Sequence, residues 1–174
     1  MRRFPVLLGL ALLLALSACG SPRVASDMRA PLECVPFARA LSGIDLAGDA
    51  PDWWWGSDGE YARGRTPEVG SVMAFAASSQ LSHGHLSVVS KVVSRREILV
   101  THANWVRHHV TTDQLVVDVS PNADWSLVRV WWPPSNTLGS RTYPVLGFIY
   151  SGHSTSHDRI VRGVPEAVRV ALDD

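Results

Sequence analysis

From Gly70 onward the chain is a series of short apolar segments, rich in Val, Ile and Trp and separated by Gly, Pro, Asn and Ser. This pattern predicts strands in the segments 71–76, 85–93, 97–105, 115–120, 125–132 and 146–150. The link Ser94–Glu97 between two of them is too short for a parallel crossover, so an antiparallel hairpin is favoured. Helical patterns precede the strands. The sequence therefore predicts an α+β fold, with N-terminal helices packed on a small antiparallel β-sheet.

Cys34 is predicted to lie at the start of the first helix. In the segment 33–43, "ECVPFARALSG", apolar side chains recur at helical spacing and Gly43 fits a C-terminal stop. Pro36 has no N–H to donate, so it is tolerated only in the first turn. Cys34 therefore lies at or just before the helix N-terminus, where partial positive charge and free N–H groups favour a thiolate.

A second helix is expected to begin near Asp49–Asp52 and to carry three consecutive tryptophans, Trp53 to Trp55. Three adjacent positions spread over a wide arc of a helix, so these side chains cannot all face the core. Trp53 and Trp54 are candidates to line a groove near Cys34 and to contact a substrate. Packing in the core is the alternative for each of them.

The N-terminus has the pattern of a secretory signal. Two arginines precede an apolar run from Val6 to Leu16, which is shorter than the roughly 20 residues that a membrane-spanning helix needs. The segment ends in "LSAC" and resembles the lipobox of bacterial lipoproteins, whose cysteine is diacylated and becomes the new N-terminus. This resemblance implies a signal peptide over 1–18 and a lipid anchor on Cys19. It also implies a location in the cell envelope, on a membrane and facing the periplasm or the cell exterior; an ordinary cleaved signal peptide is the alternative.

The rest of the chain divides into a tether, a domain and a tail. Residues 19–30 are small and polar and are interpreted as the lipidated tether, and 31–150 as the folded domain. Residues 151–174 are interpreted as a polar C-terminal tail, with at most a short helix around Val164–Leu172. Sixteen basic and sixteen acidic residues give no electrostatic support for a nucleic-acid partner. Nothing in the sequence fixes the oligomeric state.

If Cys19 carries lipid, Cys34 has no partner in the chain. It is then a reactive thiol, half of an intermolecular disulfide, or a buried inert side chain. A catalytic thiol needs a base. His85 opens one predicted strand and His102 lies near the end of the next, so antiparallel pairing makes them neighbours. His102 and Asn104 project to the same face of their strand, and either can orient His85.

Four segments in order, "ECVPFAR", "PEVGSVMAF", "GHLSVVS" and "THANW", resemble the CHAP family of cysteine, histidine-dependent amidohydrolases/peptidases, within the NlpC/P60-like, papain-fold group. The resemblance implies a CHAP-like catalytic domain over 31–150, with Cys34 as nucleophile and His85 as general base. The third polar position of the family falls on His102, with Asn104 two residues on. Relatives cleave peptidoglycan as D,L-endopeptidases or N-acetylmuramoyl-L-alanine amidases, so peptidoglycan peptides are the implied substrate.

Three positions depart from the family pattern, and one of them, Ser71 in place of an Asp after Gly70, concerns a turn rather than chemistry. Many relatives have an acidic residue in place of His102, although a neutral imidazole nitrogen can also accept the N–H of His85. Relatives often carry an amide donor just before the nucleophile, where this chain has Glu33, which we expect beside the substrate. Trp105 is expected to shield the histidine contact from water and to border the substrate. The alternative function is a catalytically inactive, peptidoglycan-binding envelope lipoprotein of the same fold.

Zinc binding is a further possibility at the "HGH" pair, where His83 and His85 could share a metal with Cys34 or His102. No carboxylate or second cysteine completes such a ligand set, and the thiol-hydrolase interpretation explains more residues. No metal and no other cofactor is therefore expected.

Overall fold

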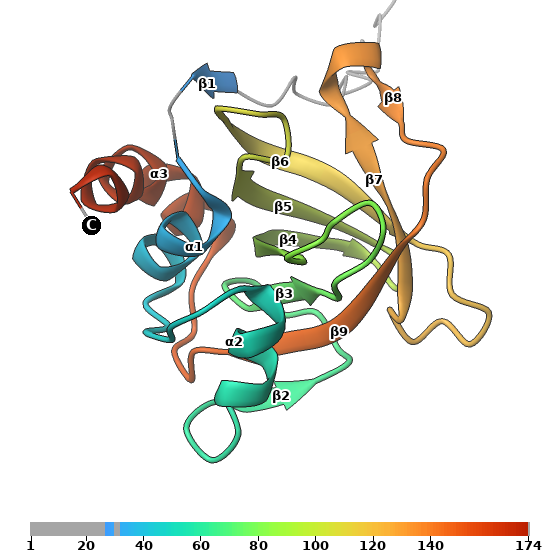
Figure 1. Ribbon diagram of the computed structural model, residues 1–174, viewed down its shortest axis with the longest axis horizontal. Helices are drawn as coiled ribbons and strands as arrows, with labels where there is room; N and C mark the ends of the chain where they lie inside the picture. Colours follow the sequence, from blue (N-terminus) through green and yellow to red (C-terminus); the bar gives the residue numbers. More distant parts are fainter. Residues whose placement is uncertain (1–26, 30–31, 174) are drawn as a thin grey trace, which may run out of the picture.

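The computed structural model of the chain describes residues 27–29 and 32–173 (Figure 1). The expected signal peptide, the lipidation candidate Cys19 and most of the expected tether lie outside the described residues. The helices are α1 (Cys34–Ser42), α2 (Ala50–Gly56) and α3 (His157–Leu172). The strands are β1 (Asp27–Arg29), β2 (Ala62–Gly64), β3 (Val72–Phe75), β4 (His85–Ser94), β5 (Glu97–Ala103), β6 (His109–Asp118), β7 (Leu127–Trp132), β8 (Thr137–Leu138) and β9 (Tyr143–Tyr150). None of the described helices is long and apolar enough to cross a membrane.

The strands form one antiparallel sheet in the order β1-β6-β5-β4-β3-β9-β7-β8, with β2 paired to β9. Strand β7 pairs with both β6 and β9, so the six longer strands close into a ring. Figure 1 shows the sheet curving from β3 through β6 to β7. The mixture of helix and antiparallel sheet agrees with the prediction. The sheet is larger than predicted and barrel-like, because the closing pairs join strands whose partners are not encoded locally.

Each of the six predicted strands is present, although β6 begins at His109 rather than at 115 and β9 at Tyr143 rather than at 146. The predicted hairpin is confirmed, since β4 and β5 pair with Ser94 opposite Glu97. Strands β1, β2 and β8 were not predicted, because two or three residues are too short to show a period of two. Strand β1 pairs with β6, so part of the segment interpreted as a tether lies on the sheet.

Apolar side chains from all six strands of the ring meet in one buried cluster, which includes Phe75, Val100 and Phe148. Because side chains alternate along a strand, this shared set marks the inner face of the ring. Neighbouring positions form a second cluster, in which Ala38 of α1 and Trp53 of α2 are buried with Leu86 of β4. The first residues of β4 thus carry side chains toward both clusters, and His85 starts this strand.

The C-terminal segment differs from the predicted tail. Helix α3 begins at His157, capped by the Ser156 side chain, and runs to Leu172. One face of the helix is buried, with Ile160 and Val164 among the residues that pack toward α1 and β6. The segment is therefore a docked amphipathic helix and not a loose tail. Gly163 and Pro165 lower its intrinsic helix propensity, which is why the sequence pattern indicated only a short helix.

Candidate active site

Cys34 is the first residue of α1, as predicted. Glu33 precedes it in extended conformation, Pro36 falls in the first turn, and Gly43 ends the helix in the left-handed region with φ 73°. The backbone N–H of Leu86 favours the ionised form of the Cys34 sulfur and so lowers its pKa. Leu86 directly follows His85 on β4, so this contact holds the thiol beside the start of that strand.

The Cys34 thiol is more difficult to ionise than a free cysteine. Burial raises its pKa, and the negative charges of Glu33 and Asp49 raise it further. The N–H groups of Leu86 and of Cys34 itself act in the opposite direction but do not outweigh burial. The N–H at the helix N-terminus thus favours the thiolate as expected, but burial outweighs it, and the resting thiol is protonated at neutral pH.

His85 and His102 form a buried pair, which confirms that antiparallel pairing makes them neighbours. His85 Nε2 lies 3.1 Å from His102 Nδ1, and the side chains are 4% and 0% exposed. Burial lowers the pKa of His85 to about 3. Burial, and then the charge of His85, lower the pKa of His102 well below its ordinary value. Both imidazoles are neutral at pH 7, so the contact is one N–H···N hydrogen bond and not an ion pair.

An aromatic wall covers this pair. Trp105 stacks on His102 with a centroid distance of 5.5 Å and lies 5.2 Å from His85, which agrees with its expected shielding position. Phe75 and Tyr143 complete the wall, at 5.7 Å and 4.9 Å from Trp105. Neither was a candidate from sequence. Phe75 ends β3 opposite His85 and Tyr143 begins β9, so only strand pairing brings them to this site.

Asn104 does not bond to His85. Its side-chain N–H donates to Glu33 Oε2 at 2.7 Å, and its Oδ1 accepts the backbone N–H of His108 at 2.9 Å. The expectation that Asn104 shares a face with His102 is wrong, because Asn104 follows the end of β5 with a positive φ of 62° that breaks the alternation. Of the two orienter candidates, His102 therefore contacts His85. Asn104 instead joins the end of β5 to the start of α1.

The tryptophans of α2 lie elsewhere. Trp53 has no exposed surface and belongs to the core shared with β3 and β4, so the expectation that it contacts substrate is wrong. Trp54 is half-buried and packs against the bare backbone of Gly147, where a Cβ would lie 2.5 Å from the ring. The Arg63 guanidinium lies over the Trp54 ring, 5.0 Å from its centroid. The ring of Trp54 therefore packs against Gly147 and Arg63 of the domain itself. Trp55 is the exposed member of the three.

His83 faces away from the histidine pair. Its Nδ1 lies 2.8 Å from Asp49 Oδ2 in an exposed ion-pair position. Among the described residues, no three His, Cys, Asp or Glu side chains gather as a metal site would require.

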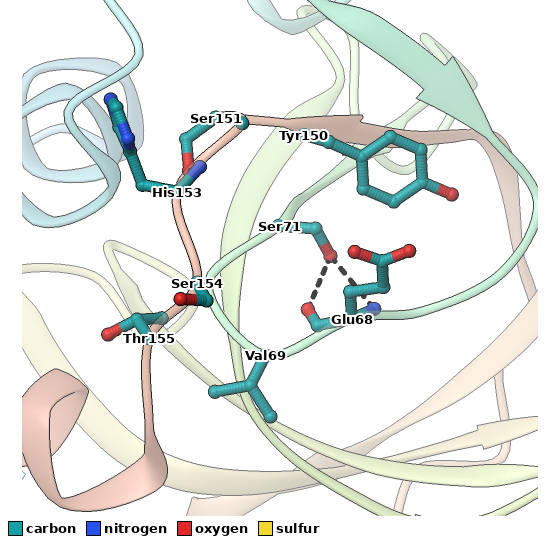
Figure 2. A pocket seen from close by; sticks show the side chains of 9 residues that line it. Glu68, Val69, Ser71, Tyr150, Ser151, His153, Ser154 and Thr155 are labelled. Atoms are coloured by element: carbon teal, nitrogen blue, oxygen red, sulfur yellow. Dashed lines mark hydrogen bonds between the residues drawn. The ribbon is translucent and has the colours of Figure 1, made fainter.

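A pocket of about 350 Å³ lies at the opposite end of β3, where β9 leaves the sheet (Figure 2). Figure 2 shows Tyr150 and Glu68 on one side and the loop 151–155 on the other. The Ser71 hydroxyl is bonded within the wall, to the Glu68 carbonyl at 2.7 Å. None of the site residues predicted from sequence lines this pocket.

The chain matches the sequence model of one protein family. The model of the CHAP domain matches residues 25–104, a range that contains Cys34, His85, His102 and Asn104. No curated protein matches the chain.

Proposed function

Because the chain contains a CHAP domain, we propose that it hydrolyses peptide or amide bonds of peptidoglycan, with Cys34 as the nucleophile and a papain-like arrangement of helix and sheet. CHAP domains are in general amidases or peptidases that act on peptidoglycan. One observation supports the assignment most strongly. The thiol at the start of α1 touches Leu86, and the adjacent His85 is bonded to a second buried histidine at 3.1 Å. These contacts support Cys34, His85 and His102 as nucleophile, base and orienter.

The resting charges of the site define the first step. A protonated thiol and a neutral imidazole do not form a ready ion pair, so His85 acts as a general base when substrate is present. His85 takes the Cys34 proton on its Nδ1 while the sulfur attacks the scissile carbonyl carbon. His102 Nδ1 accepts the other N–H of His85 and stabilises the imidazolium that forms. Bound substrate excludes water above the aromatic wall, which strengthens this contact.

The remaining steps return the site to its resting state. The backbone N–H of Cys34, at the N-terminus of α1, holds the oxyanion of the tetrahedral intermediate. The carbon–nitrogen bond then breaks, His85 gives its proton to the leaving amine, and a thioester remains on Cys34. Water, deprotonated by His85, attacks the thioester and releases the carboxylate product with a free thiol.

We also propose that the chain works from a membrane surface. The "LSAC" segment supports diacylation of Cys19, and two acyl chains are sufficient for stable anchoring. The residues between Cys19 and the start of β1 at Asp27 then link the lipid to the domain. With such an anchor the site would lie in the cell envelope, close to the membrane and within reach of the nearest peptidoglycan layers.

Digestion of purified peptidoglycan tests the reaction and identifies the bond. Wild type releases soluble fragments whose masses distinguish an endopeptidase, which shortens stem peptides, from an amidase, which separates peptides from glycan. Cys34→Ala releases none, whereas Ser140→Ala, a change of similar size at an exposed position, releases as much as wild type. Equal release by Cys34→Ala would reject catalysis at Cys34.

A non-catalytic peptidoglycan-binding protein is the second candidate, and the raised pKa of the Cys34 thiol favours it. Such a protein sediments with peptidoglycan without releasing fragments. An enzyme releases fragments, and peptidoglycan peptides slow alkylation of Cys34 by occupying the site.

A further inference from the structure

Three polar side chains, Ser87, Thr111 and Gln114, lie beside His102 on the inner face of the ring, and with His102 they form a set of four. Thr111 is the partner of His102 across β5 and β6, and Gln114 pairs with Val100, whose side chain belongs to the inner cluster. On β4, Ser87 pairs with Met73 of the same cluster. Ser87 and His102 are each one residue beyond the pair formed by Val88 and Thr101, so they are also opposite one another. The four side chains therefore form a continuous patch of the interior.

Each of these side chains has a polar atom without a partner in the part of the chain that the structure describes. The atoms are Ser87 Oγ, His102 Nε2, Thr111 Oγ1 and Gln114 Oε1, and the four residues are at most 2% exposed. Buried polar atoms are nearly always hydrogen-bonded. Four unsatisfied atoms on adjacent positions of one face point to a shared partner, and a single internal water has the capacity to satisfy several of them.

The chemistry of the set decides which way its hydrogen bonds run. Gln114 Oε1 only accepts, and the two hydroxyls can accept or donate. His102 Nε2 is the one group that must be either a donor or an acceptor according to its tautomer. Because the neutral ring carries one proton, an Nε2–H leaves the Nδ1 lone pair free to accept from His85 Nε2–H. The opposite tautomer would present an Nδ1–H to His85 and reverse that bond.

We propose that Thr111 and Gln114 are positioning residues that act through one buried water to hold His102 in its Nε2–H tautomer, with Ser87 as the third partner of the water. The water accepts from His102 Nε2–H and from one of the hydroxyls of Thr111 and Ser87, and it donates to Gln114 Oε1 and to the other hydroxyl. His102 Nδ1 is thereby kept as an acceptor, and His85 keeps its Nδ1 lone pair for the thiol. This inference rests on the proposed function for its catalytic meaning, but the tautomer of His102 is a property of the protein without substrate.

Long-range ¹H–¹⁵N correlation spectra of the full chain, labelled with ¹⁵N-histidine, test the proposal at pH 7. The expected spectrum assigns His102 a protonated Nε2 and an unprotonated Nδ1. Gln114→Met removes the acceptor at nearly constant volume, and Thr111→Val removes the hydroxyl, and each shifts His102 toward the Nδ1–H tautomer. Thr111→Ser keeps the hydroxyl and restores the wild-type pattern.

The chain offers a matched control. Thr101 precedes His102 on β5, is equally buried, and also has a hydroxyl with no partner among the described residues. Its side chain points away from the inner face, because Thr101 pairs with Val88, which belongs to the second cluster. Thr101→Val therefore removes the same group without reaching the patch, and leaves the His102 tautomer unchanged. A wild-type His102 with a protonated Nδ1, or a tautomer that is unchanged in both Gln114→Met and Thr111→Val, overturns the proposal.

Activity gives a second readout that separates this inference from the proposed function. If wild type digests peptidoglycan, Gln114→Met lowers kcat by roughly 10-fold to 100-fold at unchanged KM, because the base loses its oriented partner. If wild type has no activity, the proposed function fails while the tautomer measurement still decides the inference. Unchanged kcat in variants with a shifted tautomer would overturn the catalytic part.

Discussion

The His85–His102 pair makes the fold sensitive to acid. The pKa of His85 is about 3 in the folded protein because the ring is buried, and 6.5 is its ordinary value. A group with a lowered folded pKa binds fewer protons in the folded than in the unfolded state, so its stabilising effect is complete above pH 6.5 and is lost as the pH falls toward 3. Between pH 7 and pH 4 this linkage costs about 3 kcal/mol of unfolding free energy for His85 alone. The lowered pKa of His102 adds to the loss in the same direction.

Urea unfolding followed by circular dichroism at pH 7, 5.5 and 4, at constant ionic strength, measures this loss. His85→Gln removes the titrating ring, so its unfolding free energy falls by about 3 kcal/mol less than that of wild type over the same range. The comparison within each variant across pH cancels the cost of the substitution itself. His153→Gln, at an exposed position, keeps the wild-type pH dependence. Parallel pH profiles for wild type and His85→Gln would refute the buried, neutral pair.

Three further substitutions test other parts of the structure. Glu33→Gln removes a charge that raises the pKa of the neighbouring thiol, so the pH profile of iodoacetamide labelling shifts to lower pH; an unchanged profile would mean that this charge is screened. Trp53→Ala lowers the unfolding free energy by about 3–5 kcal/mol in urea, whereas Trp55→Ala changes it by about 0.5 kcal/mol or less, and similar values for both would contradict the core position of Trp53. Ile160→Ala lowers the unfolding free energy by about 2–5 kcal/mol, and Val170→Ala, at an exposed position of the same helix, lowers it much less. Equally small effects of both substitutions would mean that the C-terminal segment is a loose tail after all.

Local rules predict local features of this chain well. Pro36 is tolerated only in the first turn of a helix, and Gly43 is suited to the position that ends one. Both ends of α1 therefore follow from the sequence. The short link at Ser94–Glu97 fixes a hairpin, and register shifts between Val89 and Lys91 and between Val92 and Ser94 then bring His102 within hydrogen-bond reach of His85. Antiparallel pairing predicted the two histidines as neighbours, whereas the register shifts that bring the rings into contact were not predicted.

Features that depend on burial or on non-local pairing were not accessible. Three adjacent tryptophans look alike in sequence, and only the packing of α2 on the sheet distinguishes the buried Trp53 from the exposed Trp55. The helix N-terminus predicts a more acidic thiol, but desolvation outweighs it, and burial cannot be determined from spacing. Asn104 leaves the face of its strand because of one positive φ, which the alternation rule does not anticipate.

The central claim is that the Cys34 sulfur forms a covalent bond with peptidoglycan, and trapping of the thioester tests it most directly. Purified full chain is mixed with peptidoglycan fragments, quenched in acid, and analysed by intact mass and by peptide mapping. The account predicts an added mass equal to the acyl fragment, located on the peptide that contains Cys34 and missing in Cys34→Ala, which also releases no product. Product release without an adduct at Cys34, or release that continues in Cys34→Ala, would contradict it.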